Sequence, residues 1–317
     1  EFVQSGDTLT INASDKAIIN YGSFDIAQDE RVVVNLPSQS SQILNRVTSG
    51  STTNISGMIN CNGIFILINE SGIYIAPTGT INSAGLVLST RDINNQDFTN
   101  GNLIFRKISQ KDLDTLLLNE GTINITSGGF GVLIAGAIEN KGVITAKVGT
   151  IAIAGANHVI LQMAGNSLIS VAIDEAVAGT VTDYQGNPVT DQIKNTGTLD
   201  ADGGTVILAA SSINDIFTRA INLEGVVRAD RVENNGGVIR IMADGDVDIS
   251  GVVRANEFAV ESVNYNQISA LQPKVVTIGP AAGVKAAERI YIEASQAINI
   301  ASVLEAPTVT LVSGGDV

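Results

Sequence analysis

A short phrase of alternating apolar and polar residues recurs along the chain and predicts β-strands. It runs glycine, then valine, threonine or a similar residue, then an aliphatic residue, a polar residue and a small residue. Its copies begin at Gly79, Gly121, Gly142, Gly197, Gly225, Gly251 and, with serine replacing glycine, Ser302. Alternation with a period of two places one face of a strand in the core and the other in solvent. Each copy therefore predicts a short, half-buried strand, and we assign its leading glycine to the turn before that strand.

The spacing of the copies predicts a solenoid. Successive copies start 42, 21, 55, 28, 26 and 51 residues apart, which corresponds to one or two periods of about 21 to 28 residues, as in repeat folds. A second strand-like phrase follows several copies, beginning at Gly149, Gly204, Gly237 and Arg289. Two or three strands per turn, each stacked about 4.8 Å from its counterpart, form a parallel β-helix. A β-sandwich is the alternative, but it does not explain the fixed phrase.

The pattern also predicts how the chain is organised. The repeat is interrupted at residues 91–118, 157–194 and 256–286, and we interpret these stretches as hairpins or small sheets outside the coil. Residues 1–57 lack the phrase and are expected to cap the first turn, because an open solenoid end exposes strand edges and core. We expect three regions: a cap at 1–57, a β-helical domain at 58–255 with insertions at about 91–118 and 157–194, and further turns at 256–317 that continue beyond the C-terminal residue.

Composition excludes several classes of protein. Hydrophobic residues make up 44% of the 317 residues but aromatic residues only 4%, so aliphatic side chains must fill the core of a slender β protein. One cysteine and one histidine exclude a disulfide scaffold and a zinc module. A net charge of −14 argues against nucleic acid as a partner. No apolar run approaches 18 residues and no basic, apolar leader opens the chain, so we expect neither a membrane helix nor a signal peptide.

The strongest candidate for site chemistry is a group of three aspartates, Asp244, Asp246 and Asp248. Alternation predicts that they share one strand face, where they could bind Ca²⁺ or act as acid and base in glycoside cleavage. An EF-hand loop is excluded because Ile249 and Ala255 occupy the positions of its glycine and its distal glutamate. A solvated turn and strand face is the favoured interpretation, and we expect no metal site.

The single histidine and the single cysteine are interpreted as structural. His158 has no second histidine with which to build a metal site, and Cys61 lies in an apolar stretch typical of a buried thiol. No nucleotide-binding glycine motif is present. We therefore expect no cofactor and no catalytic activity.

Residues 44–93 carry the motifs that relate the chain to a known family. They include the sequence LNRV at 44–47, the segment 57–69, and the residues Gly85, Leu86, Ser89 and Thr90. The family's hallmark Asn-Pro-Asn-Gly-Ile appears as the sequence NESGI at 69–73, with three of its five positions kept. The segment resembles the haemagglutination activity domain, the amino-terminal secretion domain of filamentous-haemagglutinin-like exoproteins of bacterial two-partner secretion. The resemblance extends over about residues 5–255.

The resemblance implies a right-handed parallel β-helix with an N-terminal cap, in an all-β protein with extra-helical hairpins. It also implies recognition in the periplasm by the polypeptide-transport-associated domains of an outer-membrane transporter, followed by delivery to the cell surface or beyond. Downstream regions would then bind a host or cell-surface glycan or protein. The residues expected to serve transporter recognition are Asn45, Arg46, Asn69, Gly72, Ile73 and Gly85. The alternative is a β-helical carbohydrate-active enzyme or glycan-binding module that uses the three aspartates.

Overall fold

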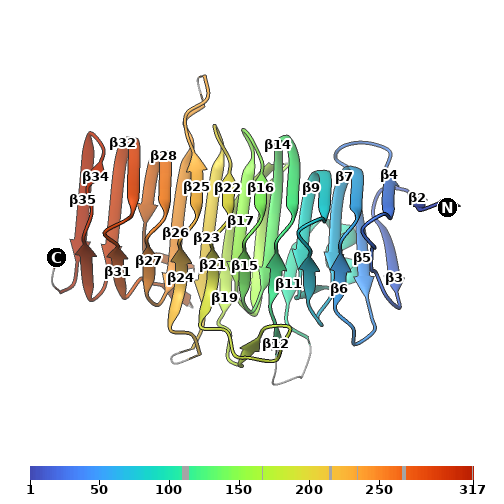
Figure 1. Cartoon of the computed structure of the whole chain (residues 1–317), viewed down its shortest axis with the longest axis horizontal. Helices are drawn as coiled ribbons and strands as arrows, with labels where there is room; N and C mark the ends of the chain where they lie inside the picture. The colour runs from blue at the N-terminus through green and yellow to red at the C-terminus, as the bar shows by residue number, and fades with distance from the viewer. Residues whose placement is uncertain (109–113, 166, 214–215, 234, 266–268, 316) are drawn as a thin grey trace.

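The chain winds into a long coil of parallel strands, with its N and C termini at opposite ends of the long axis (Figure 1). Each turn pairs in parallel with the next, so the predicted parallel β-helix is confirmed. Among the described residues, no helix has the length and apolar character needed to cross a bilayer. The computed structural model describes residues 1–108, 114–165, 167–213, 216–233, 235–265, 269–315 and 317.

The repeated phrase forms the first of three parallel sheets, sheet 1. Ile144 lies beside Ile123 and Leu199, and the column continues through Val227 and Val253. Each of these side chains is at most 1% exposed, so the predicted internal column is confirmed. The strands of sheet 1 are β2 (Thr8–Asn12), β4 (Arg31–Asn35), β7 (Met58–Ile68), β9 (Thr80–Ser89), β14 (Thr122–Ala135), β16 (Val143–Thr145), β22 (Thr198–Asp200), β25 (Val226–Ala229), β28 (Val252–Val260), β32 (Gly283–Ala294) and β34 (Leu304–Glu305).

Two further parallel sheets close the coil. The long strands β7, β9, β14, β28 and β32 continue from sheet 1 into sheet 2. There they join β3 (Ala17–Tyr21), β5 (Gln42–Val47), β17 (Thr150–Gly155), β23 (Thr205–Ser211), β26 (Val238–Asp244) and β35 (Thr308–Ser313). Sheet 3 consists of β6 (Thr53–Ile55), β8 (Ile73–Ile75), β13 (Leu117–Asn119), β15 (Ile138–Asn140), β21 (Asp191–Asn195), β24 (Arg219–Leu223), β27 (Val247–Ile249), β31 (Val275–Ile278) and β33 (Ala297–Ile300).

A ladder of buried asparagines stands at the corner where sheet 3 leads into sheet 1. Asn119 Nδ2 donates to Asn140 Oδ1 at 2.7 Å, and Asn140 Nδ2 donates to Asn195 Oδ1 at 2.7 Å. All three side chains are fully buried. Buried amides need hydrogen-bond partners, and repeating the same residue in successive turns supplies a partner from each neighbouring turn.

The glycines that lead the phrase permit close approach between turns, which corrects their assignment to turn geometry. None of them adopts a positive φ. A Cβ on Gly197 would lie 2.1 Å from the carbonyl oxygen of Gly142, and a Cβ on Gly225 would lie 2.1 Å from that of Gly197. Further along, a Cβ on Gly283 would meet its nearest atom only at 3.9 Å. In that turn Ala282 occupies the position equivalent to Gly251, because Gly283 lies beside Val252. The stack of glycines has therefore ended there, and Ser302 takes the equivalent position in the last copy.

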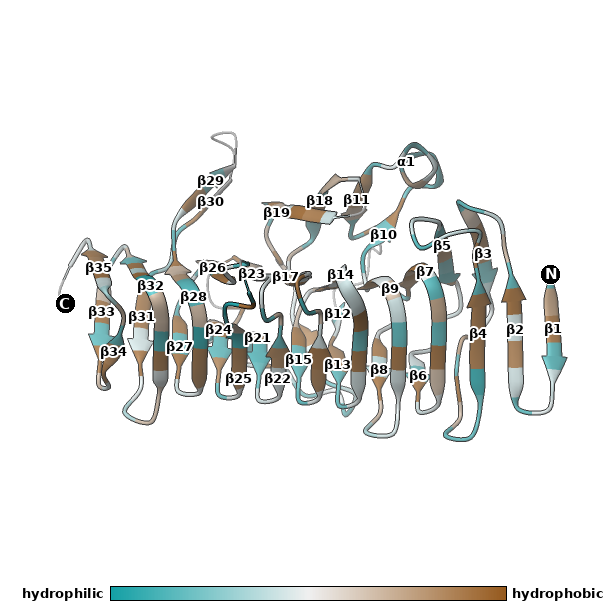
Figure 2. Cartoon of the chain, turned by 90° about the horizontal axis from the view of Figure 1, so that it is seen from above, coloured by the Kyte–Doolittle hydropathy of each residue, from teal (hydrophilic) through white to brown (hydrophobic). Residues whose placement is uncertain are grey.

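The outer face of sheet 2 changes from apolar to polar along the coil. Its outward row runs Leu44, Ile66, Val87, Val132, Ala152, Ile207, Arg240, Ala259, Tyr291 and Thr310. The part from Leu44 to Ile207 is buried under a cover that Figure 2 shows outside the coil. The cover comprises α1 (Asn95–Asn100) and an antiparallel sheet of β10 (Asp92–Ile93), β11 (Leu103–Arg106), β18 (His158–Ala164) and β19 (Ser167–Glu175).

The third predicted interruption, residues 256–286, extends too far at both ends, because residues 256–260 still belong to β28 in sheet 2. Only the hairpin of β29 (Val263–Tyr265) and β30 (Ser269–Leu271) projects from the coil (Figure 2), whereas β31 and the first part of β32 belong to its sheets. Gly283 lies beside Val252, and Val284 beside Val253. The phrase is one residue shorter in this turn, so its glycine occupies a strand position and the pattern search missed it.

Residues 1–57 contain both an end strand and complete turns. β1 (Phe2–Ser5) pairs antiparallel with β2 at the end of sheet 1. The strands β2, β3, β4 and β5, by contrast, already pair in parallel with their counterparts in later turns. A remaining short pair, β12 (Asp114–Thr115) with β20 (Val181–Thr182), lies outside sheet 3.

The glycine stack generates a stability prediction. Gly197→Ala is expected to lower the free energy of unfolding by about 1–3 kcal/mol, the usual penalty for overpacking, because the new methyl group meets a backbone carbonyl of the preceding turn. Gly283→Ala is the matched control and should change stability by less than about 1 kcal/mol, since space is available there. Urea unfolding monitored by circular dichroism measures both. Equal effects of the two substitutions would contradict the close-approach argument.

Candidate functional site

Asn45 and Arg46 are neighbours on β5 and point to opposite sides of sheet 2. Asn45 is fully buried, where its Nδ2 donates to the carbonyl oxygen of Ile66 at 3.2 Å and its Oδ1 accepts from the Tyr21 hydroxyl at 2.9 Å. The Asn45 amide therefore ties two turns and a tyrosine together inside the coil. A partner molecule could reach it only if the first turns opened.

Arg46 fastens the cover to the early turns. Its Nε pairs with Asp92 Oδ1 at 2.8 Å, and its Nη2 donates to the carbonyl oxygen of Ile93 at 2.7 Å. Lys16 makes a similar connection, because its Nζ donates to the carbonyl oxygen of Phe98 at 2.9 Å and lies 4.8 Å from the centre of that ring. These two cations attach β10 and α1 to β3 and β5.

Residues 69–73 form the tight corner between β7 and β8. The Asn69 side chain is buried, with Nδ2 donating to Thr53 Oγ1 at 2.9 Å and Oδ1 accepting from the Ser71 amide at 2.9 Å. The Gly72 amide donates to the Asn69 carbonyl at 3.1 Å, and Gly72 has a φ of +108°, which favours glycine. Ile73 begins β8 and is fully buried.

The corner explains which hallmark positions are kept in this chain. Asn69 supplies the hydrogen bonds, Gly72 the backbone conformation, and Ile73 a core side chain. Glu70 and Ser71, the two positions that depart from the family hallmark, are only partly buried. Substitution there leaves the internal bonds of the corner in place, because the Ser71 bond to Asn69 uses the backbone amide.

Gly85 has a packing role. It lies between Ile64 and Phe130 in sheet 2, and a Cβ at this position would come within 2.9 Å of Ile64 Cγ1 and 3.1 Å of the Phe130 ring. The glycine therefore makes room for a large side chain from the next turn.

The two motif segments border one surface groove of about 450 Å³. The turn after β5 and the corner after β7 form its sides, with Arg46 and Asp92 in the wall. Its lining is completed by Val47, Thr48, Ser49, Gly50, Ile68, Glu70, Ser71 and Ile108. The structure thus brings Arg46 and the corner at 69–73 to one place, whereas the side chains of Asn45 and Ile73 are buried and Gly85 lies elsewhere in sheet 2.

Sequence reasoning missed a buried ion pair beside these motifs. Arg91 is 1% exposed, and its Nη2 contacts Asp114 Oδ2 at 2.5 Å. Its Nε donates to the carbonyl oxygen of Ala156 at 2.8 Å. The signal available in the sequence was an arginine two residues after the end of the apolar strand β9, but its partners lie too far along the chain for any local pattern to identify them.

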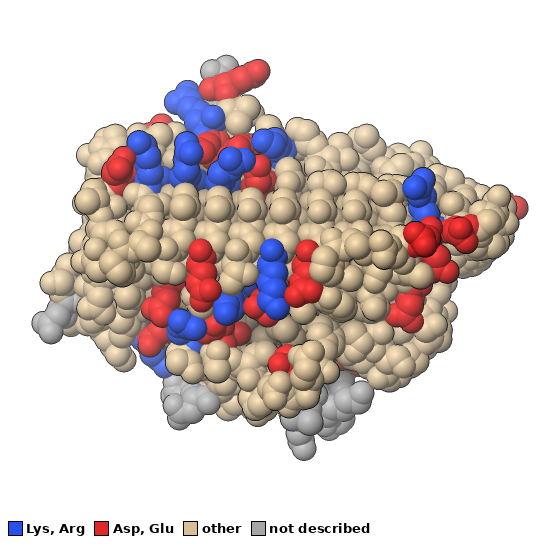
Figure 3. Space-filling view, viewed as in Figure 1, with Lys and Arg blue, Asp and Glu red and all other residues tan. Residues whose placement is uncertain are grey.

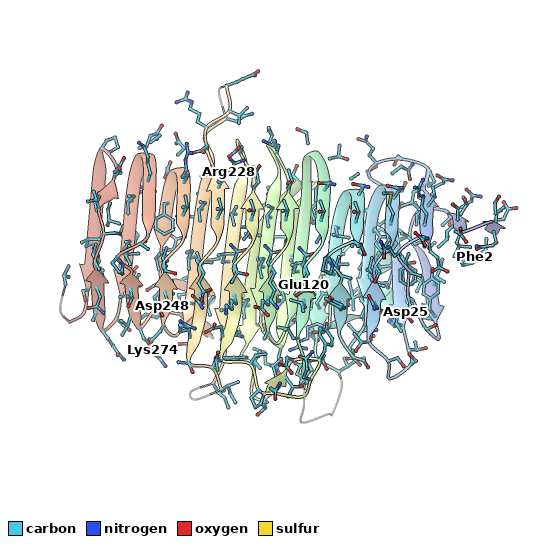
Figure 4. All side chains as sticks on the ribbon, viewed as in Figure 1. Phe2, Asp25, Glu120, Arg228, Asp248 and Lys274 are labelled. Carbon is cyan, nitrogen blue, oxygen red and sulfur yellow. The ribbon has the colours of Figure 1, made fainter. Side chains whose placement is uncertain are left out.

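The three aspartates do not share one strand face, which corrects that prediction. Asp244 ends β26 in sheet 2, the chain turns at Gly245, whose φ is +155°, and Asp248 lies on β27 in sheet 3. Asp248 pairs with Arg219 at 3.4 Å, whereas Asp244 and Asp246 border a hollow of about 210 Å³ with Lys274; Asp248 and Lys274 are labelled in Figure 4. Within the described part of the chain, no three acidic, histidine or cysteine side chains converge as metal ligands.

Burial raises the pKa of two of the candidate groups, the Asp244 carboxyl and the Cys61 thiol. It raises the pKa of Asp244, with Lys274 opposing the effect. It also raises the pKa of Cys61 to about 11, against a weaker lowering effect of the Gly63 backbone N–H. The Cys61 thiol lies in the core between Val34 and Ser83 of adjacent turns, and at neutral pH it is protonated and inert.

His158 belongs to the cover. Its Nδ1 pairs with Asp174 Oδ1 on the neighbouring strand, and its Nε2 accepts from Arg106 Nε at 3.1 Å. Both ring nitrogens are therefore used between β11, β18 and β19, as expected of a structural histidine.

Comparisons with known proteins identify relatives of the chain. The TPS secretion domain family model matches residues 3–255. Two heme/hemopexin-binding proteins of Haemophilus influenzae are similar. One, from strain Rd, is 29% identical over 250 residues, covering 77% of this chain and 26% of the relative. The other is 26% identical over 292 residues, covering 87% and 28%. The chain thus spans about a quarter of the length of the curated relatives it matches.

A solved structure supports the fold. The HMW1 secretion domain from Haemophilus influenzae matches with a TM-score of 0.66 and 22% identity, covering 98% of this chain and 96% of that one. The expected right-handed parallel β-helix is thereby confirmed. The matching family is one of secretion domains of exoproteins that leave the cell through an outer-membrane transporter, and it is not an enzyme family. Because its model covers 3–255 of the 317 residues, the chain belongs to the TPS, or two-partner secretion, secretion-domain family.

Proposed function

We propose that this chain is the export signal and folding start of a larger surface exoprotein, and that the transporter reads the corner at residues 69–72. The observation that carries the proposal is the local character of this corner. The bond from the Ser71 amide to Asn69 Oδ1 spans two residues, and that from the Gly72 amide to the Asn69 carbonyl spans three. Such turns form without tertiary contacts.

Locality matters because a chain that threads a narrow pore has to be unfolded. The polypeptide-transport-associated domains would then meet segments that have no tertiary structure. Glu70 and Ser71 lie at the outer part of the corner, where a turn formed in the unfolded chain would present them. These two side chains are the proposed contact points, and Asn69 and Gly72 hold the backbone that positions them.

The remaining predicted recognition residues are proposed to act in folding. Asn45 and Ile73 are fully buried and Gly85 is enclosed by neighbouring turns, so these three residues are accessible only in the unfolded chain. Arg46 holds the cover against β5. These four residues acquire their full set of contacts only after export, once distant segments have come together.

The activity of the whole exoprotein is proposed to lie beyond this chain. The similar proteins are about four times longer than the matched region, and their names refer to binding heme or hemopexin. We propose that downstream regions of this exoprotein bind a host or cell-surface ligand, with heme and its carrier protein as the first candidates to test. We also propose that the present chain is not catalytic, since its acidic candidates diverge at the Gly245 corner.

Recognition of the corner can be separated from folding by a pair of variants. Glu70→Lys combined with Ser71→Lys changes the outer surface of the corner and leaves both backbone hydrogen bonds in place, so we expect secretion to fall at least about tenfold with little change in the unfolding midpoint. Asn124→Ala, which removes an outer-face hydrogen bond to Asn82, is the control and should secrete normally. Quantitative immunoblotting of culture medium, with urea unfolding of purified protein, measures both effects. Normal secretion of the double variant would refute the proposed contact.

The alternative function as a calcium-dependent glycan-active module is tested by metal binding. Saturating a genuine site at 100 times its dissociation constant would stabilise the fold by about 2.7 kcal/mol. We expect no such gain when Ca²⁺ is added, and the same thermal midpoint for Asp246→Asn as for the unsubstituted chain. A Ca²⁺-dependent rise in midpoint that Asp246→Asn abolishes would favour the alternative, and depolymerisation in a polysaccharide screen would establish catalysis.

A further inference from the structure

Arg91 is a buried cation whose partners arrive late in the chain. The contact to Asp114 spans 23 residues, that to the Ala156 carbonyl 65 residues, and that to Asn157 Oδ1, at 3.1 Å, 66 residues. A buried guanidinium that lacks its partners is strongly unfavourable, because its donors have lost water and gained nothing. The turn that ends at Arg91 therefore cannot close stably until residues 156–157 are in place.

The cover imposes the same delay on a large apolar surface. Leu44, Val87 and Val132 on the outer face of sheet 2 are completely buried, in one cluster with Phe105 of β11 and Val159 of β18. β11 pairs antiparallel with β18, so that Phe105 lies opposite Val159. Before β18 and β19 are present, the outward row of the first turns faces water. Exposed apolar area of that size opposes folding of those turns alone.

Polar contacts carry the coupling to both ends of the covered region. Towards the N-terminus, Lys16 and Arg46 bind α1 and β10 to the first strands of sheet 2. Towards the C-terminus, Thr150 Oγ1 of β17 donates to the carbonyl oxygen of Leu168 in β19 at 3.3 Å, and Ile207 of β23 lies in the same buried cluster. The covered turns thus extend from β3 to β23, and they share contacts that no adjacent pair of turns could make.

In later turns the apolar cover shrinks to the β29–β30 hairpin, whose Leu271 lies in the same buried cluster as Met242 of β26. The outward row continues with Arg240, whose side chain is 54% exposed, and Arg289 nearby is equally exposed while pairing with Glu257 at 2.7 Å. Polar outer faces can remain in water, so each of these turns needs only its neighbours.

We infer that residues 16–211 fold as one cooperative unit, which closes only when the β18–β19 hairpin has joined it. Arg91 makes this order obligatory. The turns after residue 211 then add one at a time. The early part of the coil is therefore not built turn by turn. The consequence of this folding order for export rests on the proposed function. About the first 175 residues have to leave the transporter before the first turns can fold stably, and until then the leading segment stays unfolded and can pass through the pore.

Native-state hydrogen exchange on the whole chain tests the inference without involving the transporter. Amides of β5, β9 and β18 should open with the same free energy and the same urea dependence, as one cooperative unit does. Amides of β31 and β33 should exchange faster and respond less to urea. If the amides of the early strands kept full protection while those of β18 and β19 exchanged freely, the inference would be overturned, whatever a secretion assay shows.

Substitution of Arg91 tests its particular role. Arg91→Met leaves Asp114 buried, with Lys107 Nζ 3.7 Å from its Oδ2, and should raise exchange in β5, β9 and β18 together by about 100-fold or more. Arg228→Met removes an ion pair to Asp200 on the outer face, where the arginine side chain is 34% exposed. This control should raise exchange by less than about fivefold.

A milder variant keeps the test decisive if Arg91→Met does not fold. Lys107→Met weakens the same charge cluster and should raise exchange by a smaller, equal factor in all three strands. An effect of either variant that is confined to β12 and β18 would refute the ordering role of Arg91.

Discussion

The structure depends on one constraint: the backbone of each turn must lie close enough to hydrogen-bond with the backbone of the next turn along its whole length. At that spacing, aliphatic side chains in equivalent positions stack directly, as Ile144 and Leu199 do, and buried amides can bond only along the stack, as Asn119 and Asn140 do. Corner positions admit no Cβ where two turns approach most closely, which is why glycines stack there. The repeat in the sequence follows from a repeat in space.

The outer faces are where the turns differ, and their differences set the role of each region. Over the first part of the coil, sheet 2 presents an apolar row that has to be covered. Further along, the exposed rows are charged, and Figure 3 shows lysines and arginines interleaved with acidic residues along the coil. Arg228 pairs with Asp200 at 2.6 Å and Lys285 with Glu305 at 3.0 Å. Local balance of this kind lets a chain of net charge −14 keep these faces in water without strong repulsion.

The motifs that mark the family belong to two physical classes. The corner at 69–72 contains two hydrogen bonds within itself besides those that it makes with residues 51–53 and Ser89, so its turn can form before the coil does. Asn45, Arg46 and Gly85 depend on partners in other turns or in the cover, so they become ordered only with the fold. The proposed function uses both classes, because in that proposal the chain is recognised while it is unfolded and folds after export.

The sequence by itself determined the strands, the internal column and the family, because alternation and a fixed phrase report directly on which side of a strand each residue faces. Tertiary structure alone decided the rest. Asp244 and Asp248 are close in sequence but are separated by a corner at Gly245, and a shortened phrase hid the turn containing Val284. Arg91 and Asp114 meet only because the chain leaves the coil after β9 and comes back beside Arg91 at β12. A local sequence pattern reflects the environment of a single strand. These contacts depend instead on where the chain turns and on which distant segments meet in the folded protein.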